Sequence, residues 1–389
     1  MPGPVMPGPL MRLAIIAPHF PEYALRYAAA MAKCCDVLVC IDAGQMAAEY
    51  AGRAAPAVPG GQVAPVMFRT PADLWRLARL VRRFRPDVVH LQEAAGPRRG
   101  AFLACIAAML RRSALIVLTV HDPVPHGGRD AGVARRAAWS RNLVRRLADV
   151  LVVHGAHCAR LLREDLAARR PEVPQPGLPQ IVQSEHGLIL EPSLVRPPQP
   201  GPLRLYFFGR MEAYKGVEVL LEAAELLHGE GLPFRLLVAG HGPELDRLQD
   251  RFQRLPEVEV RAGFAPPGEI IEAIQEVDCV VLPYLSATQS GVLAAAFAGR
   301  RFVIASAAGG IPDVVGHLRN GLLVPPGDPH ALAAAIRAAG DEGLRAQLRD
   351  GAAETAQGQL DWDRIGRELH ATFMAAVAER RAARMVRAS

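Results

Sequence analysis

The chain of 389 residues is too long for one hydrophobic core of ordinary size, so two domains are expected. Half of its residues are hydrophobic and 22% are charged, which excludes a disordered chain. No apolar run reaches the ~18 residues of a membrane-spanning helix, and the amino-terminal sequence lacks the cleavage-site pattern of a secretory signal. The six cysteines show neither a Cys-x-x-Cys pair nor a metal-binding spacing, which is typical of free thiols in the cytoplasm.

Apolar segments that predict strands alternate with helical patterns through the first half of the chain. The strand-like segments are residues 12–18, 36–43, 86–92, 114–122, 149–155 and 180–187. Strands that are apolar throughout and separated by helices predict a parallel sheet covered by helices on both faces.

Two of the helical segments are rich in arginine, residues 76–85 and 134–149, in a chain of net charge +6. A solvated helix face explains such a segment most simply. The alternative is attraction to an anionic membrane surface or to a phosphorylated acceptor. Nucleic acid is not expected as a partner, because aromatic residues make up only 5% of the chain and no known binding motif is present.

A linker is predicted at residues 190–203, where five of fourteen residues are proline. The alternation then restarts, with strand-like segments at residues 203–210, 234–242, 258–264, 278–284 and 301–307. We therefore expect an α/β protein of two doubly wound, Rossmann-like domains, residues 1–193 and 194–355, facing a central cleft. Residues 356–389 predict a helix that crosses back toward the first domain. Ligands should bind at the carboxyl ends of the strands.

Two cations follow the first strand of the second domain, in the segment "FFGRMEAYKG" at residues 207–216. The guanidinium of Arg210 can grip phosphate oxygens, and Lys215 adds a point charge. Both precede a helix, whose amino end favours anions. This combination is suited to a diphosphate.

The same segment resembles the diphosphate-binding motif of GT-B-fold glycosyltransferases of the large retaining family 4. The resemblance continues through "LLVAGHGPE", "VDCVVLPY", "ATQSGVLAAAFAG", "VIASAAGGIPDVV" and "RNGLLVPPGD", so it covers almost all of the second domain. It implies a GT-B fold in which the first domain binds the acceptor and the second binds a UDP-, GDP- or ADP-linked sugar. It also implies transfer with retention, without a metal or another cofactor.

The first domain matches more loosely. "LTVHDPVPH" at residues 118–126 resembles a family segment whose histidine faces the transferred sugar, and His154 and His186 are weaker candidates of the same kind. The resemblance implies three sets of site residues. The catalytic set is His121, Arg210 and Lys215; the donor-binding set is Gly209, Phe264, Thr288, Gln289, Ser290, Gly291 and Val292; the acceptor-side set is His19, Phe20 and Glu22.

Two glutamates that the family usually carries are missing. Their positions are Ser286 and Ala294, or Ala287 and Ala295, depending on where a one-residue gap falls. The remaining "TQSGV" resembles a known variant within the family, and its backbone N–H groups can hold a phosphate without a carboxylate. We expect the loss to alter how the sugar and ribose are held.

The expected function is that of a cytoplasmic, hexosyltransferase-type glycosyltransferase of polysaccharide biosynthesis, with peripheral contact at the inner face of the membrane as an additional expectation. The acceptor would be a glycan, a lipid-linked molecule or a small molecule. Two alternatives remain: a catalytically degenerate homologue acting as a binding or scaffold subunit, and a membrane-surface adaptor. Two weaker motifs are discounted. "GHGPEL" at residues 240–245 lacks the third glycine of a dinucleotide-binding fingerprint, so a Rossmann dehydrogenase is not expected. "DWD" at residues 361–363 has the form of a metal-binding Asp-x-Asp motif, but it opens a helix, where the helix dipole favours acidic residues without a metal.

Overall fold

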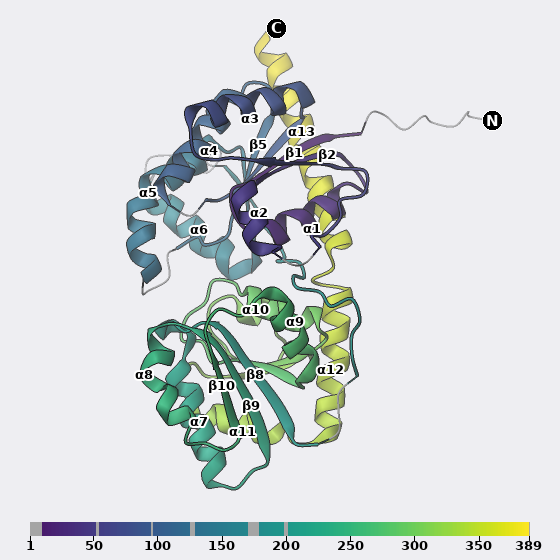
Figure 1. Ribbon diagram of the computed structural model, residues 1–389. Coiled ribbons are helices and arrows are strands. Elements are labelled where there is room, and N and C mark those ends of the chain that lie inside the picture. Colours follow the sequence, from purple (N-terminus) through teal and green to yellow (C-terminus); the bar gives the residue numbers. More distant parts are fainter. Residues whose placement is uncertain are drawn as a thin grey trace, which may run out of the picture.

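Two parallel α/β domains stack on each other, with the chain passing from the upper to the lower one in Figure 1. This computed structural model describes residues 10–51, 54–94, 96–124, 129–169, 179–197 and 201–388. Within these residues, no helix combines the length and apolarity required to cross a membrane.

The first domain is built on a seven-stranded sheet in the order β3-β2-β1-β4-β5-β6-β7, with every pairing parallel. Its strands are β1 (Arg12–Ala17), β2 (Asp36–Asp42), β3 (Gln62–Val66), β4 (Val88–Gln92), β5 (Leu115–Val120), β6 (Val150–His154) and β7 (Gln180–Ser184). Its helices are α1 (Pro21–Met31), α2 (Ala43–Glu49), α3 (Pro71–Phe84), α4 (Pro97–Leu110), α5 (Arg129–Leu147) and α6 (Gly155–Arg169).

Helices cover both faces of this sheet. Helices α3, α4, α5 and α6 share one buried cluster with one face, while α1 shares a second cluster with the other face and with the carboxyl-terminal helix. Local sequence explains where the helices start: Thr70 and Asp73 form a reciprocal capping box ahead of α3, and Pro71 occupies its first turn.

The second domain has a six-stranded parallel sheet in the order β10-β9-β8-β11-β12-β13. Its strands are β8 (Leu203–Arg210), β9 (Phe234–His241), β10 (Val258–Ala262), β11 (Cys279–Leu282), β12 (Phe302–Ser306) and β13 (Gly321–Val324). Its helices are α7 (Val217–Gly229), α8 (Pro243–Phe252), α9 (Pro267–Glu276), α10 (Gly291–Ala298), α11 (Pro329–Ala338) and α12 (Glu342–Gln357), with short 3-10 turns η2 (Ala213–Lys215) and η3 (Ile311–Asp313).

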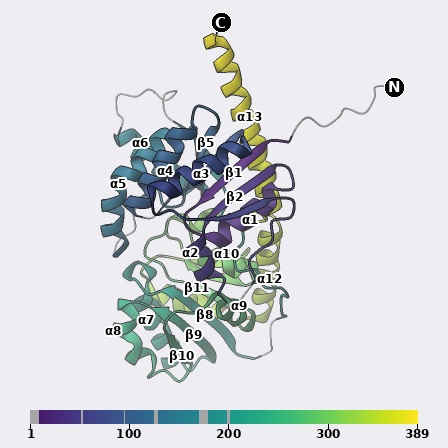
Figure 2. The same ribbon diagram turned by 45° about the horizontal axis from the view of Figure 1, so that its top comes forward.

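The last helix, α13 (Trp362–Ala388), leaves the second domain and packs against α1 of the first (Figure 2). Trp362 is buried, donates a 2.7 Å hydrogen bond to the carbonyl of Leu188 and meets the ring of Tyr23 edge-on at 5.1 Å. About three turns further along α13, Phe373 is fully buried against His90. The helix therefore completes the core of a domain to which it is not adjacent in sequence.

The expected α/β fold of two doubly wound domains is confirmed, and two strands escaped prediction. Strand β3 contains Pro65 and is largely exposed, so it lacks the continuous apolar pattern of the central strands. Strand β13 has only four residues. Both lie at sheet edges. Strand β3 was missed because it is exposed, whereas β13 is apolar and mostly buried and was missed because its apolar segment is short.

Replacing Phe373 by alanine should lower the free energy of unfolding by about 3–5 kcal/mol, because a buried aromatic ring leaves a cavity between α13 and the first sheet. Urea denaturation followed by circular dichroism measures the change. Its neighbour Met374 is 46% exposed, so Met374→Ala is the matched control and should change stability by no more than about 0.5 kcal/mol. Equal effects of the two variants would contradict the packing of α13.

Candidate active site

The carboxyl ends of the two sheets meet where the domains touch. The segment after β5 reaches the segment after β11, since the Thr288 hydroxyl donates a 2.7 Å hydrogen bond to the carboxylate of Asp122. At a second contact the backbone N–H of His157, in the first turn of α6, donates to Asp313 at 2.9 Å. These contacts bring the ends of strands from both domains together, which is where parallel α/β sheets bind ligands.

Three histidines from three strand ends of the first domain form one cluster. His121 follows β5, His154 ends β6 and His186 follows β7. The ring centroids of His121 and His154 are 5.4 Å apart, and those of His154 and His186 are 5.2 Å apart. Tyr23 of α1 contacts all three rings, and Phe20 contacts His121 at 4.9 Å. Sequence reasoning ranked His154 and His186 low, because nothing local shows that they adjoin His121.

Burial keeps these imidazoles neutral. It lowers the pKa of His121 and of His186 to about 4, and it lowers the pKa of His154 well below its ordinary value. Nearby imidazoles add to the lowering for His121 and His154. The Nε2 of His121 lies 3.0 Å from the Oε1 of Gln92. With the Gln92 amide in this orientation, the tautomer that fits carries its proton on Nε2 and has an acceptor at Nδ1.

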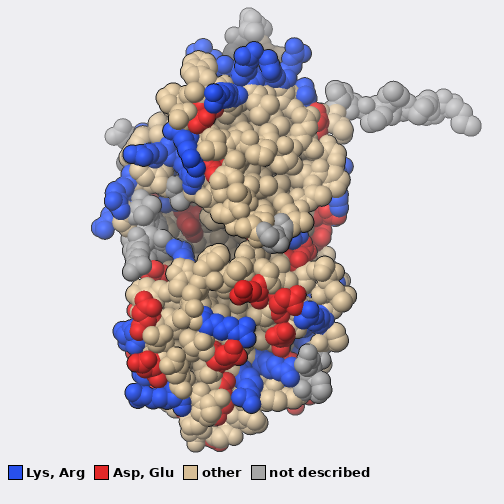
Figure 3. All heavy atoms as spheres, viewed as in Figure 1, with Lys and Arg blue, Asp and Glu red and all other residues tan. Residues whose placement is uncertain are grey.

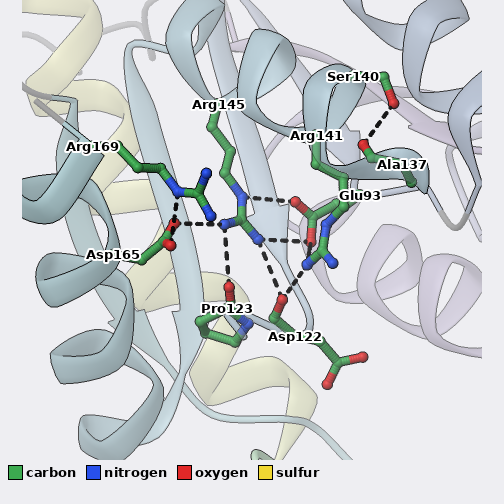
Figure 4. A network of polar contacts seen from close by, with 9 residues as sticks. All are labelled: Glu93, Asp122, Pro123, Ala137, Ser140, Arg141, Arg145, Asp165 and Arg169. Carbon is green, nitrogen blue, oxygen red and sulfur yellow. Dashed lines mark hydrogen bonds and ion pairs between the residues drawn. The ribbon is translucent and has the colours of Figure 1, made fainter. Parts of the chain in front are cut away.

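A buried ion-pair network holds the segment that follows His121 (Figure 4). Arg145 of α5 grips both carboxylate oxygens of Glu93, at 2.8 and 3.2 Å, and Arg141 lies 3.0 Å from the same carboxylate. Arg145 also donates to the backbone carbonyls of Pro123 and Asp122, each at 3.2 Å, and Arg141 donates to the Asp122 carbonyl as well. The network therefore anchors the backbone between the His121 ring and the interdomain contact of Asp122.

Glu93 remains charged in this setting. Burial by itself would raise the pKa of its carboxyl, but Arg145 and Arg141 together hold that pKa below its ordinary value. Arg145 reaches a second carboxylate, Asp165 of α6, at 3.5 Å, and Asp165 pairs in turn with Arg169. Sequence reasoning missed Glu93, although a carboxylate directly after a buried strand was an available signal.

The second domain contributes a buried cation. Lys215 lies in η2 and is 8% exposed; its Nζ donates to the hydroxyl of Tyr284 at 2.7 Å and lies 4.4 Å from the centre of that ring. Gly216 has φ 68°, and a Cβ there would lie 1.8 Å from the carbonyl oxygen of Pro283, so only glycine permits this approach. A Cβ on Gly209 would be 3.7 Å from the Lys215 Nζ and 3.9 Å from Val292, which places the strand end, the cation and α10 side by side.

Helix α10 begins at the acid-free segment. The Ser290 side chain accepts a 3.3 Å hydrogen bond from the backbone N–H of Leu293 and so caps the helix. The segment of Gly309 and Gly310 packs against the residues just before this helix. A Cβ on Gly309 would lie 1.5 Å from the carbonyl oxygen of Ala287, and a Cβ on Gly310 would lie 2.1 Å from that of Thr288. The two glycines therefore let the two backbone segments pack closely. The segment is thus braced from behind, with its helix start toward the first domain.

A cavity of about 30 Å³ lies between the histidine cluster of the first domain and the start of α10 in the second. It is large enough for a single water molecule. Its lining includes His154, Glu185 and His186 from the first domain and Gln289, Ser290 and Asp313 from the second. The burial of Glu185 raises the pKa of its carboxyl. Two of the predicted donor-side residues, Gln289 and Ser290, therefore adjoin the two lower-ranked histidines.

The acceptor-side residues lie around the start of α1. Phe20 adopts a left-handed backbone conformation with φ 55°, and its half-exposed ring lies against His121. His19 contacts Arg99, which also reaches the carboxylate of Asp42. Glu22 is buried; it accepts hydrogen bonds from Arg26, from the Tyr50 hydroxyl and from the backbone N–H of Leu190.

The remaining predicted residues differ in their exposure. Arg210 is the exposed last residue of β8, and Phe264, 77% exposed, follows β10 and Gly263, whose φ is 127°. Thr288 is almost fully buried and its hydroxyl is engaged by Asp122. Gly291 starts α10, and a Cβ added there would lie 3.3 Å from the side chain of Ile189, in the segment after β7.

Side chains suited to a metal gather elsewhere. In the described ranges, one group of three candidate ligands has its ligand atoms within 4.8 Å of one another: Cys34, Cys35 and His370, at the contact of α1 with α13. Burial raises the pKa of both thiols, which disfavours the thiolate that a metal needs. Tertiary structure thus assembles a set that no sequence spacing showed, away from the interdomain site.

Comparisons with known proteins agree with this architecture. Residues 22–179 match the family model "Glycosyltransferase Family 4", and residues 202–341 match "Glycosyl transferases group 1". Among curated proteins, the glycogen synthase of Mycobacterium tuberculosis is 27% identical over 305 residues, covering 76% of this chain and 70% of that protein. The D-inositol 3-phosphate glycosyltransferase of Jonesia denitrificans is 36% identical over 181 residues, covering 43% of this chain and 42% of that protein.

A solved structure is similar over nearly the whole chain. HepE from Anabaena in complex with UDP-glucose superposes with a TM-score of 0.66 at 15% identity, covering 94% of this chain and all of that one. The two family matches lie in the two domains in the order first domain, second domain, and together span most of the chain. The protein therefore belongs to the glycosyltransferases of the GT-B fold, with a family 4 domain followed by a glycosyl transferases group 1 domain.

Proposed function

We propose that this protein transfers a sugar from a nucleotide-diphosphate donor to an acceptor hydroxyl, with retention of configuration. The observation that carries the proposal is the juxtaposition of the Lys215 cation, the Gly209 strand end and the start of α10 at Val292. Support also comes from the relatives, which are glycosyltransferases, and from the similar HepE structure, whose complex contains UDP-glucose.

Lys215 and Arg210 are proposed to hold the diphosphate and to stabilise the charge that develops as the sugar leaves. An ammonium has three donors, so after its hydrogen bond to Tyr284 two N–H groups of Lys215 remain for phosphate oxygens. The burial of Lys215 strengthens this attraction, because few waters screen it. Backbone N–H groups of Ser290, Gly291 and Val292 at the start of α10 complete the phosphate site without a carboxylate.

The histidine cluster is proposed to face the transferred sugar. Neutral His121 offers an acceptor at Nδ1, which can take a hydrogen bond from a sugar or acceptor hydroxyl, while Gln92 holds the opposite side of the ring. Phe264 is proposed to lie beside the nucleotide base, and Thr288 and Gln289 to shape the sugar pocket from the second domain. His19 and Phe20 would contact the acceptor, whereas Glu22 would hold their loop through its structural hydrogen bonds.

The proposed setting is the cytoplasm, at the inner face of a membrane. The proposed acceptor is a glycan or a lipid-linked molecule of polysaccharide biosynthesis, with a hexose as the proposed transferred unit. The arginine-rich helices of the first domain motivate the peripheral membrane contact. No metal or other cofactor is proposed for the reaction.

Replacing Lys215 or Arg210 by alanine should lower kcat/KM by roughly 10²- to 10³-fold each, because a preorganised charge is removed from the leaving diphosphate. Nucleotide release is measured with a panel of nucleotide-sugars, and UDP, GDP and ADP binding by titration calorimetry. Arg235→Ala is the control: Arg235 is exposed at the amino-terminal end of β9, the end opposite to the candidate site, and its replacement should leave turnover unchanged. Unchanged turnover in the Lys215 variant would overturn the assignment, and binding of none of the three nucleotides would favour a scaffold subunit.

Replacing Arg145 by lysine should lower kcat while the KM for the donor changes little, because a single ammonium cannot hold Glu93 and two carbonyls at once. Arg145→Ala should in addition lower the free energy of unfolding by about 3–5 kcal/mol, since Glu93 loses its main partner. Steady-state kinetics and urea denaturation measure the two effects, with the exposed Arg163→Ala as control. A lysine variant with wild-type kcat would show that the loop does not depend on this guanidinium.

Acidification should destabilise the protein through the histidine cluster. The folded-state pKa of His121 and His186 is about 4, below the ordinary 6.5, so the unfolded chain binds protons more readily between these values. Their contribution to stability is complete above pH 6.5 and is lost as the pH falls toward 4. Urea denaturation at several pH values should give a shallower decline in this window for His121→Gln than for the wild type or for the exposed His330→Gln. Identical slopes would contradict the burial of a neutral His121.

A further inference from the structure

Helix α3 exposes a stripe of arginine beside a tryptophan. Trp75 is 63% exposed, and Arg79 and Arg83 follow it at intervals of four residues, so the three lie on one side of the helix. The opposite side, with Leu77 and Val81, packs into the core. Within the described ranges, neither Arg79 nor Arg83 has a carboxylate partner, which leaves their charge directed at solvent.

A surface groove of about 880 Å³ runs along this helix. Six arginines and Trp75 line it, and no carboxylate is among the lining residues. Like charges held together repel one another, so a site of this composition favours an anionic binding partner that spreads over several positions.

Helix α5 repeats the pattern. Arg135, Trp139 and Leu143 follow at intervals of four residues on its exposed side, with Trp139 57% and Leu143 41% exposed. The chain has three tryptophans, and Trp362 is buried in the core. Tryptophan is usually well buried, so two exposed tryptophans, each spaced with arginine on its helix, require a functional explanation.

The two stripes lie on one outer surface of the first domain. Helix α4 packs between α3 and α5, and all three cover the same face of the sheet (Figure 2). Between the stripes α4 exposes the small, uncharged Cys105 and Ala108. Figure 3 shows basic side chains gathered on this side of the first domain with little acid, whereas the second domain mixes both signs; on α3–α5 these basic residues are arginines.

We propose that this surface, defined by Trp75, Arg79 and Arg83 of α3 and Arg135, Trp139 and Leu143 of α5, docks the protein on an anionic phospholipid bilayer. The inference rests on the peripheral membrane contact of the proposed function and names the surface that makes it. Arginines attract anionic headgroups, and tryptophan rings settle at the level of the headgroups. The aliphatic Leu143 favours a bilayer over nucleic acid, because it can neither stack on a base nor pair with a phosphate.

The docked orientation places the membrane beside the active site. Helices α4 and α5 begin after β4 and β5, the strands whose carboxyl ends carry Gln92 and His121. The starts of both helices therefore lie at the edge of the interdomain site. A bilayer against α3–α5 would present the headgroup of a lipid-linked acceptor next to this edge.

The test is flotation of the purified full chain with phosphatidylcholine vesicles that contain or lack phosphatidylglycerol, without any nucleotide-sugar. The wild type should float only with the anionic vesicles, with a blue shift of tryptophan fluorescence, and should be released by salt. Arg79→Glu/Arg83→Glu and Trp75→Ala/Trp139→Ala should each weaken binding roughly tenfold or more. The control Arg235→Glu/Arg254→Glu makes the same charge change on exposed arginines of the second domain and should float like the wild type.

Failure of the wild type to float with anionic vesicles, or equal flotation of the surface variants and the control, would overturn the proposal. So would binding to neutral vesicles of equal strength. Duplex DNA and single-stranded RNA are tested in parallel; tighter binding to either one, lost in the same variants, would assign the surface to nucleic acid instead. Because flotation needs no sugar transfer, its outcome is separate from that of the proposed reaction.

Discussion

The burial of the Glu93 carboxylate is the constraint on which the interdomain site depends. A carboxylate at the end of a buried strand is tolerated only with strong partners, and Arg145 and Arg141 supply them from one helix. The same guanidinium groups have N–H donors to spare, and these hold the carbonyls that follow His121. One ion-pair network therefore fixes α5, the His121 segment and, through Asp122, the contact with the second domain.

The two walls of the site differ in charge, and the difference follows from burial. On the first domain, desolvation keeps three adjoining histidines neutral, which suits them to hydroxyl groups. On the second, Lys215 remains beside the π face and hydroxyl of Tyr284, near a helix start that favours anions. The arrangement separates a neutral side from a cationic side, and the proposed reaction assigns the first to the sugar and the second to the diphosphate.

Helix α13 and the exposed face of α3–α5 lie on opposite sides of the first sheet. The return of α13 buries Trp362 and Phe373, and so ties the second domain to the core of the first. On the opposite face, α3, α4 and α5 pack on the sheet, and two tryptophans are exposed on their outer side. The carboxyl-terminal helix thus packs on one side of the first domain, and the exposed side of α3–α5, where the membrane contact is proposed, lies on the other.

The sequence by itself determined the two sheets, the linker between them and the Arg210–Lys215 motif, because apolar periodicity and loop chemistry are local properties. The central strands and the edge strands β7 and β10 were predictable, while β3 was missed because it is exposed and contains a proline, and β13 because its apolar segment is only four residues long. Only the tertiary structure decided that His121, His154 and His186 adjoin, that Glu93 meets Arg145 and that Thr288 meets Asp122. The physical reason is that these contacts join residues far apart in the chain, and the strand order and domain packing alone set which of them meet.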